Sequence, residues 1–517
     1  MTLHRRLLLI LIAVLAALPA WAQFSRVEST GDGPMILTVA DTLFLNGEYE
    51  AARDTLDKWL ATPAGQTATN YYNRGVLARY IGKGTGLGWF RKAYDLSTEP
   101  FRASWALGQA LTEAGSLVEG ETYLRDAVSL DKGYYESSVA LGHNLRLQKR
   151  YDEALAAMRK TFGRDRTYVN AYTEVAKTYL EMSDTSSALR IMHEGYAKFP
   201  YEQILIEMIR THHASTEADS VVLFGKEYLS LYPKGPNLTE VLDDLRKADP
   251  KTQWKSSGKY ELAPFGPDGI PEEPRESLPV NIQLQYDVRY GFIGIGSLNV
   301  DLLDGEYKGQ RCWRARYVAT SAPAIPFVSI ADTFYAYIDR QLRYTIRLET
   351  HYHEMGYKAV KVYESDYDTG KFEARIVLAN NLWMIQMHPL PPDVYDSTSQ
   401  LWFAQQIVVA GKSGNCRVEL SGGFETTIIH NRGRDGTVEI DGELRPRVKI
   451  DGIMRYAGIA GLTGDYQGWY SLSPAVWPVM AKFKIFLGWI TIAYDDHVPT
   501  SLPKGPTFRS TLIQSLH

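Results

Sequence analysis

Cysteine is scarce in this sequence, with only Cys312 and Cys416 among 517 residues. Two cysteines cannot build a Cys-rich zinc site or a disulfide scaffold. An excess of one charge is also missing, because 56 Lys and Arg residues face 60 Asp and Glu residues, for a formal charge of -4. Nucleic acid selects strongly basic surfaces, so this balance argues against a nucleic-acid partner.

Long apolar runs are missing after the first residues of the chain. The basic cluster His4-Arg5-Arg6 precedes an uncharged run over residues 7–18, and Ala20-Trp21-Ala22 follows as a small-residue cleavage pattern. A helix of that length reaches about 18 Å, less than the ~30 Å core of a membrane. Residues 1–22 are therefore predicted to be a cleaved secretory signal rather than a membrane anchor. The mature chain is predicted to reach the periplasm of a Gram-negative-type bacterium and not to be an integral membrane protein.

Catalytic and cofactor motifs are also missing. No Gly-x-Ser-x-Gly elbow occurs. Gly411-Lys412-Ser413 ends like a P-loop, but Gln406 stands where the first glycine is required. The sequence therefore predicts no cofactor and favours a protein that is not an enzyme.

The first half of the chain repeats every 34 residues. A small residue recurs at Ala52, Gly86, Gly120, Ala154 and Ala188, and a large apolar one at Leu56, Phe90, Leu124, Met158 and Met192. Small residues let two helices approach closely, and the large ones fill the space between neighbours.

This pattern resembles the tetratricopeptide repeat, whose signature is carried by Ala140-Leu141-Gly142, Tyr151, Ala154 and Pro200. The resemblance covers residues 32–245, with five clear repeats and a degenerate sixth after residue 200. It implies an α-solenoid, or superhelix, whose groove binds a protein or peptide partner. By family register the groove is lined by Tyr71, Trp105, Gln109, His143, Arg146 and Lys177. Two interpretations stay open: these residues bind a partner, or they merely solvate the groove or cover a neighbouring domain.

A linker and a change of period mark the second half. Residues 246–279 are rich in proline and glycine and lose the helical period. From residue 282 apolar and polar residues alternate, and short strand-like runs follow with turns between them. These include one run over residues 372–386 and turns at Asp435-Gly436 and Asp441-Gly442. A helix is expected at residues 396–408. The fold class is therefore an α-solenoid followed by an antiparallel β-rich domain, as a barrel, half-barrel or sandwich.

The β half resembles an exported bacterial family named domain of unknown function 3108. The resemblance covers residues 280–499 and leaves a tail at 500–517. It rests on the run over residues 286–291 with Gly294 and Gly296, on residues 332–339, and on residues 458–462 with Gly468. It implies a β-rich fold and a cell-envelope address, without established chemistry.

Two side-chain pairs in the β half are candidates for chemistry. His351 and His353 would share one face of a strand and could reach one metal, with a third ligand such as His388. The alternative is that they are ordinary exposed strand histidines. Cys312 and Cys416 would close a disulfide in an oxidising compartment, or remain two buried thiols.

Two functions are compatible with these features. The first is an envelope scaffold or adaptor whose repeats bind a protein and whose β domain binds an envelope component, such as a lipid or polymer, or an apolar ligand. The alternative is an enzyme acting on cell wall or glycan through carboxylates or a histidine metal site in the β domain.

Overall fold

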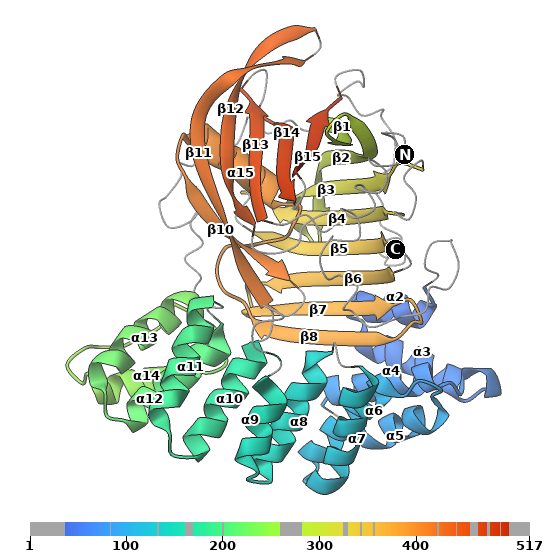
Figure 1. Ribbon diagram of the computed structural model, residues 1–517, viewed down its shortest axis with the longest axis vertical. Coiled ribbons are helices and arrows are strands. Elements are labelled where there is room, and N and C mark those ends of the chain that lie inside the picture. Colours follow the sequence, from blue (N-terminus) through green and yellow to red (C-terminus); the bar gives the residue numbers. More distant parts are fainter. Residues whose placement is uncertain are drawn as a thin grey trace, which may run out of the picture.

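The structure, a computed structural model, describes residues 37–258 and 282–495 (Figure 1). Within these ranges it leaves out residues 83, 132–133, 160, 162–168, 199–200, 324–328, 342–343, 355–356, 421–422, 441, 455–463, 473–475 and 486–487. The predicted signal (1–22), most of the predicted linker and the predicted tail (500–517) lie outside the described residues.

The helical half consists of antiparallel helix pairs followed by a last helix, α14 (Leu238–Ala248). The first helices of the pairs are α2 (Val39–Leu45), α4 (Ala68–Tyr80), α6 (Phe101–Glu113), α8 (Tyr135–Leu147), α10 (Val169–Glu181) and α12 (Glu202–Ala214). The second helices are α3 (Tyr49–Leu60), α5 (Leu87–Leu96), α7 (Leu117–Leu130), α9 (Tyr151–Arg159), α11 (Thr185–Lys198) and α13 (Ala218–Leu231). The pair α12–α13 is the degenerate sixth repeat that the sequence predicts.

The 34-residue columns pack between the helices as expected. Ala154 and Met158 of α9 are both fully buried. They lie against α8, where a Cβ atom added at Gly142 would come within 2.5 Å of Met158 Cγ. A glycine on one helix thus makes room for a methionine on the next, which explains the alternation of small and large residues in each repeat.

The second half is one continuous sheet, whose strands are almost all antiparallel. Its order is β8-β7-β6-β5-β4-β3-β2-β1-β15-β14-β13-β12-β11-β10-β9. The first eight strands are β1 (Ile282–Tyr290), β2 (Ile293–Tyr307), β3 (Gln310–Ser321), β4 (Ala331–Asp339), β5 (Thr345–Glu354), β6 (Tyr357–Asp366), β7 (Lys371–Leu378) and β8 (Trp383–Pro389). The others are β9 (Val394–Tyr395), β10 (Gly414–Leu420), β11 (Gly423–Ile440), β12 (Glu443–Met454), β13 (Gly464–Ser471), β14 (Pro478–Ile485) and β15 (Gly488–Tyr494).

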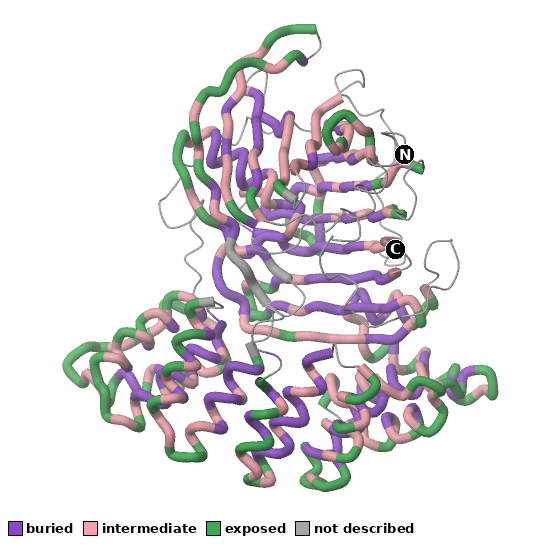
Figure 2. The backbone as a smooth tube through the Cα atoms, viewed as in Figure 1, coloured by how far each residue is buried: buried purple, intermediate pink, exposed green. Residues whose placement is uncertain are grey.

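The sheet curls around helix α15 (Gln400–Ala410) (Figures 1 and 2). Strands β5, β6 and β7 contain runs of consecutive buried residues, so both of their faces are covered. Trp402 of α15 is fully buried, and its Nε1 donates to the Tyr317 hydroxyl on β3 at 2.7 Å. The sheet ends in β8 on one side and β9 on the other, so it is an open, curled sheet, the predicted half-barrel rather than a closed barrel. No helix among the described residues has both the length and the apolar character needed to cross a membrane.

Two predicted boundaries in the sheet are wrong. The run over residues 372–386 is two strands, β7 and β8, with Asn381 at a φ of 58° in the turn between them. The turn predicted at Asp435-Gly436 is instead an irregularity inside the long strand β11, where the pairing with β12 shifts between Arg434 and Thr437. A bulge with Gly436 at positive φ explains why the residues look like a turn in the sequence.

The disulfide considered for Cys312 and Cys416 is not formed, and both are free buried thiols. Cys312 packs on β3 with Tyr307, Tyr337 and other residues of one small cluster, whereas Cys416 on β10 packs with α15 in another. Burial raises the pKa of both thiols to about 12, so they act as small apolar side chains.

Candidate functional site

The first helices of the repeats form a surface that faces the β domain, called here the first-helix face. The edge strand β8 lies across it, beside the first helices (Figure 1). Contacts with β8 and its neighbour β7 come from the N-terminal repeats, and the other end of the repeat domain contacts the turn after β6. The predicted groove is therefore partly occupied by the chain's own sheet.

At the N-terminal end, α2 and α4 hold the start of β8. The Trp383 ring stacks on Phe44 with centroids 4.5 Å apart, and Trp383 Nε1 donates to Asp41 Oδ1 at 2.6 Å. Asn73 of α4 forms hydrogen bonds with the backbone both as a donor and as an acceptor. Its Nδ2 donates to the Asn381 carbonyl at 2.7 Å, and its Oδ1 accepts from the Trp383 N–H at 2.9 Å. The Asn73 amide thus holds the turn that leads into β8.

Further along the face the contacts come from the starts of the first helices. Arg102 of α6 lies 3.5 Å from the Met384 sulfur on β8. Tyr172 on α10 and Tyr201 beside α12 share a core cluster with Leu390, just after β8. Beyond α13, Lys234 Nζ donates to the carbonyls of residues 367 and 368 in the turn after β6, at 3.0 and 2.8 Å. The sheet edge is thus held along its length.

A buried charge cluster lies where the repeats meet β6 and β7. The Arg375 guanidinium is 2.5 Å from Glu364 Oε2 and 2.6 Å from Glu373 Oε1. The hydroxyls of Tyr80 and Tyr49 both donate to Glu373. Burial opposes ionisation of Glu364, but Arg375, Arg347 and Lys308 together outweigh it and lower the Glu364 pKa to about 2. The repeat domain thus completes a charge network of the sheet.

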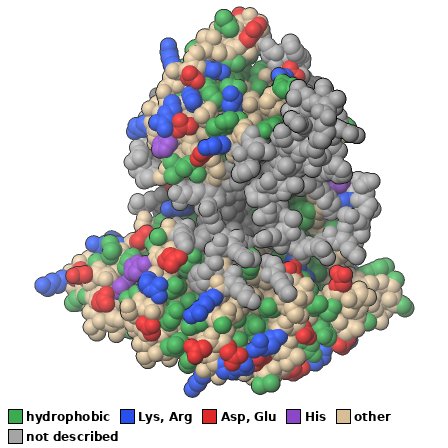
Figure 3. All heavy atoms as spheres, in the orientation of Figure 1, with side chains coloured by type: hydrophobic (Ala, Val, Ile, Leu, Met, Phe, Trp, Pro, Cys, Tyr) green, Lys and Arg blue, Asp and Glu red, His purple; other side chains and the backbone are tan. Residues whose placement is uncertain are grey.

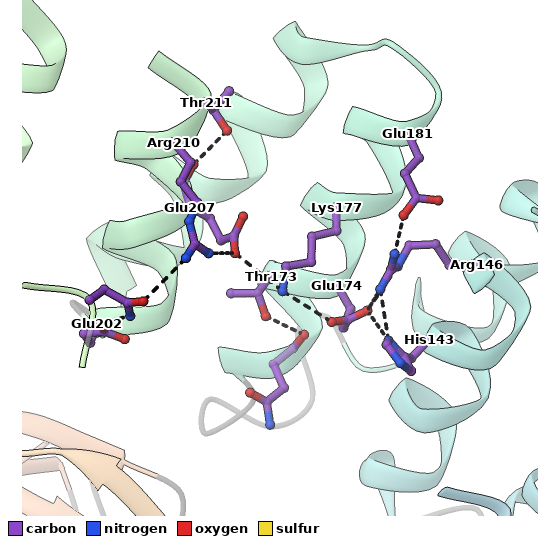
Figure 4. Close-up of polar contacts among 12 residues, drawn as sticks. His143, Arg146, Thr173, Glu174, Lys177, Glu181, Glu202, Glu207, Arg210 and Thr211 are labelled. Atoms are coloured by element: carbon purple, nitrogen blue, oxygen red, sulfur yellow. Dashed lines mark hydrogen bonds and ion pairs between the residues drawn. The ribbon is translucent and has the colours of Figure 1, made fainter. Parts of the chain in front are cut away.

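A different surface, called here the polar ladder, lies mostly on the second halves of α8, α10 and α12 and reaches the start of α14 (Figure 4). It runs from α8 to α14 and consists of His143, Arg146, Glu174, Lys177, Glu181, Glu207, Arg210 and Glu240. Glu174 on α10 accepts from Arg146 at 3.0 Å and pairs with His143 at 2.9 Å. Lys177 Nζ lies 3.5 Å from Glu207, and Arg210 bridges Glu207 at 2.8 Å and Glu240 at 2.7 Å.

The ladder combines buried and accessible charges. Glu174 is buried, which opposes its ionisation, but His143, Arg146 and Lys177 together lower its pKa to about 2. The side chains of His143, Lys177 and Arg210 remain 40%, 37% and 40% exposed. Glu174 is therefore a permanent anion in the structure, while the three exposed side chains can contact another molecule.

The structure divides the six residues that the sequence places in the groove. Tyr71 and Arg146 are buried. Trp105 is half-buried, edge-on to Tyr134 at 5.4 Å. Gln109, His143 and Lys177 are only partly buried, and Gln109 accepts from Arg79 at 3.3 Å. His143, Arg146 and Lys177 come together in the ladder, whereas Tyr71 and Trp105 serve the packing.

The histidines considered as metal ligands do not converge. His351 and His353 share one face of β5, and His351 Nε2 pairs with Glu349 at 2.6 Å. The strand register places His388 on the opposite face of the sheet, with its ring against Phe372. Within the described parts of the chain, no group of three His, Cys, Asp or Glu side chains is arranged to hold a metal ion.

Sequence reasoning missed Asp41, Asn73 and Trp383, the residues that join the two halves. Trp383 is 342 residues from Asp41 and 310 from Asn73. A single sequence carries no signal for a contact over that separation. The buried polar residue Asn73, inside an otherwise ordinary repeat helix, is the nearest to such a signal.

Comparisons with known proteins agree with this division of the chain. Residues 285–492 match the family model described as "Protein of unknown function (DUF3108)". The helical half is similar to the crystal structure of MamA, with 19% identity over 32% of this chain and 96% of that chain and a TM-score of 0.29. It is also similar to PilW, described as a "type IV pilus biogenesis factor", with 16% identity over 40% and 95% and a TM-score of 0.35.

A third similar structure is YrrB, described as "a TPR protein with an unusual peptide-binding site". It is 23% identical over 34% of this chain and 88% of that chain, with a TM-score of 0.29. No curated protein matches the chain. The resemblance of the C-terminal half is confirmed over residues 285–492, which match the DUF3108 model. The helical half consists of the helix pairs that the 34-residue repeat predicts.

Proposed function

We propose that this protein is an exported cell-envelope scaffold that presents the polar ladder to a protein partner. The observation that carries the proposal is the division of the first-helix face. Helices α2, α4 and α6 and the starts of α10 and α12 contact the chain's own sheet, while exposed side chains of the ladder lie on the second halves of α8, α10 and α12. A surface of mixed charge suits a polar protein segment with charges of both signs.

The β domain serves in this proposal as a fixed body attached to the repeats. Its edge strand is covered by helices, which protects it from pairing with other chains. A scaffold of this kind holds its partner at a constant position relative to the sheet. An enzyme acting on cell wall or glycan gains no support from the arrangement, because Glu364 and Glu373 are engaged with Arg375 in a structural network.

Neutralising the exposed ladder cations is expected to abolish partner capture. Lys177→Gln with Arg210→Gln removes two charges whose pairs are partly exposed, so stability should change by no more than about 1 kcal/mol for each pair. The measurement is affinity capture from the protein's own envelope, with mass spectrometry of the recovered proteins. Recovery should fall for proteins that the wild type captures.

The matched control carries Lys58→Gln and Arg190→Gln, which remove two exposed cations from second helices α3 and α11. It should capture the same proteins as the wild type. Equal recovery by the ladder variant and the control would contradict the role of the ladder. Far-UV circular dichroism of all three proteins checks that the repeats remain folded.

Export is the second part of the proposal and has its own test. The tripartite pattern over residues 4–22 supports cleavage after Ala22. The purified extracytoplasmic protein should begin at Gln23 when its N-terminus is sequenced. A protein that begins at Met1 would show that the pattern is not a cleaved signal.

A further inference from the structure

Three cations surround one indole ring on the β domain. Arg447 and Lys449 lie on β12 and Lys482 on β14, on either side of β13, which carries Trp469. The Arg447 guanidinium carbon and the Nζ atoms of Lys449 and Lys482 lie 5.5, 5.3 and 5.7 Å from the ring centre. These four residues are called here the Trp469 cluster.

The cluster lies on the face of the sheet that points away from helix α15. Val448, Ile450 and Tyr470, the alternate residues of β12 and β13, pack with α15 on the other face. Lys449 and Lys482 are both partly exposed. Figure 3 shows Lys and Arg side chains gathered on the upper part of the β domain.

Within the described part of the chain, the three cations of this cluster form no ion pair with a carboxylate. Lys449 and Lys482 form no ion pair there, and Arg447 Nε donates to the backbone carbonyl of Asp435 at 2.7 Å. The Asp435 carboxylate itself accepts from Trp469 Nε1 at 2.5 Å. Neighbouring cations behave differently.

A cation on the adjacent strand β11 and another on β14 are paired with carboxylates. Arg432 lies 2.8 Å from Asp451, and Lys484 lies 3.6 Å from Asp465. The charge of the Trp469 cluster is therefore a local feature and does not reflect a shortage of acidic residues nearby. The three cations repel one another. One indole ring has only two faces, so its cation–π attraction cannot offset this repulsion equally for all three.

We propose that the Trp469 cluster binds a phosphate group, as a lipid headgroup or as a soluble phosphate ester. A phosphate offers several acceptor oxygens and up to two negative charges, which suits one guanidinium and two ammonium groups. The buried indole gives the cationic side chains a fixed platform. This site is independent of the polar ladder, since it lies in the other half of the chain.

The test uses the full-length protein and two probes. Vesicles of equal parts phosphatidylglycerol and phosphatidylcholine are compared in cosedimentation with vesicles of phosphatidylcholine alone, and glycerol phosphate is titrated by calorimetry and added as a competitor. The wild type should bind at least one phosphate probe. Lys449→Gln with Lys482→Gln should weaken that binding about tenfold or more, since each basic residue near an anionic surface contributes to affinity.

Two further variants separate the site from general charge. Lys449→Arg with Lys482→Arg keeps the charges and should bind like the wild type. Lys58→Gln with Lys371→Gln removes two exposed lysines elsewhere and should also leave binding unchanged. Thermal unfolding of each variant confirms that it is folded.

Each outcome decides the proposal. Vesicle binding that glycerol phosphate displaces assigns the site to the phosphate ester itself, and vesicle binding that it does not displace assigns it to a headgroup within a membrane. Binding of glycerol phosphate without vesicle binding assigns a soluble ligand. The absence of binding to both probes, or equal binding by the wild type and the Lys449→Gln, Lys482→Gln variant, would overturn it.

Discussion

Replacing Trp383 by alanine is expected to lower the free energy of unfolding by about 3–5 kcal/mol, the usual effect of removing a fully buried large side chain. The change removes the stack on Phe44 and leaves Asp41 without the indole donor. Urea unfolding followed by circular dichroism measures the loss. The effect should be large because this one side chain joins the repeat helices to the edge of the sheet.

Two comparisons make this prediction specific. Trp383→Phe keeps an aromatic ring against Phe44 and loses the hydrogen bond to Asp41, so its effect should be intermediate. Trp59→Ala removes a tryptophan from α3 that is 50% exposed, and surface changes of this kind usually stay within about 0.5 kcal/mol. A Trp383→Ala protein as stable as Trp59→Ala would show that the contact does not hold the halves together.

The Asp332→Asn variant is expected to be more stable than the wild type above neutral pH, with a gap that grows by about 1.4 kcal/mol per pH unit until the raised pKa is reached. Asp332 on β4 is fully buried. Burial is the largest cause that raises the Asp332 pKa far above the ordinary range, and the Glu354 carboxyl at the end of β5 is the second. The His353 N–H and Lys361 lower this pKa by a smaller amount.

The sign follows from proton binding. An aspartate in the unfolded chain loses its proton near pH 3.9, whereas the folded protein keeps this proton at neutral pH. The folded state therefore binds more protons, and stability falls as the pH rises towards the folded pKa. Asparagine needs no proton to donate to Glu354, and its carbonyl can still accept from the His353 N–H, which Asp332 does at 2.8 Å.

The groups whose pKa values are lowered act in a lower pH range. The pKa values of Glu174 and Glu364 are lowered to about 2, so their contribution is lost only as the pH falls below about 4.5. Burial lowers the pKa of His388 to about 4, which affects stability below about pH 6.5. Asp301, Cys312 and Cys416 also have raised pKa values, but they are common to both proteins. The difference between the wild-type and Asp332→Asn profiles of denaturant unfolding above pH 7 therefore reports on Asp332.

The control is Asp152→Asn, on an exposed residue of α9. Its stability should change with pH as the wild type does. Parallel pH profiles for the wild type and Asp332→Asn would mean that Asp332 is ionised in the folded protein.

The regular parts of the fold could be predicted because they repeat or alternate. A small residue at the position of Ala154 and a large apolar residue at the position of Met158 recur in the clear repeats, because each helix pair packs in the same way. Strand β1 was visible because Leu284 and Tyr286 alternate with polar residues, and only one face of this strand packs against the core.

Irregular parts were missed for local reasons. Strand β13 carries Gly464 and Gly468 and buries Trp469 and Tyr470 on opposite faces, so it has neither alternation nor a clean boundary. The turn before β8 contains neither glycine nor proline, and Asn381 alone provides the left-handed conformation.

Only those residues of the candidate site that occupy fixed positions of the repeat could be predicted. His143, Arg146 and Lys177 occupy positions that the family register turns towards the inner face, and they do lie together. Their partners Glu174 and Glu207 were not predicted, because the choice of ion pair depends on side-chain directions between helices. The contact with β8 could not be predicted from the sequence, because neither the repeat pattern nor the strand pattern indicates how the two halves pack against each other.

Native-state hydrogen exchange of the full-length protein tests most directly the claim that the first-helix face holds strand β8. Peptides from α2, α4, β7 and β8 are followed at increasing denaturant. The account predicts that these four elements lose protection together, with one common opening free energy, because they share Trp383, Asp41 and Asn73 in a single core. Loss of protection in β7 and β8 while α2 and α4 remain fully protected would contradict it.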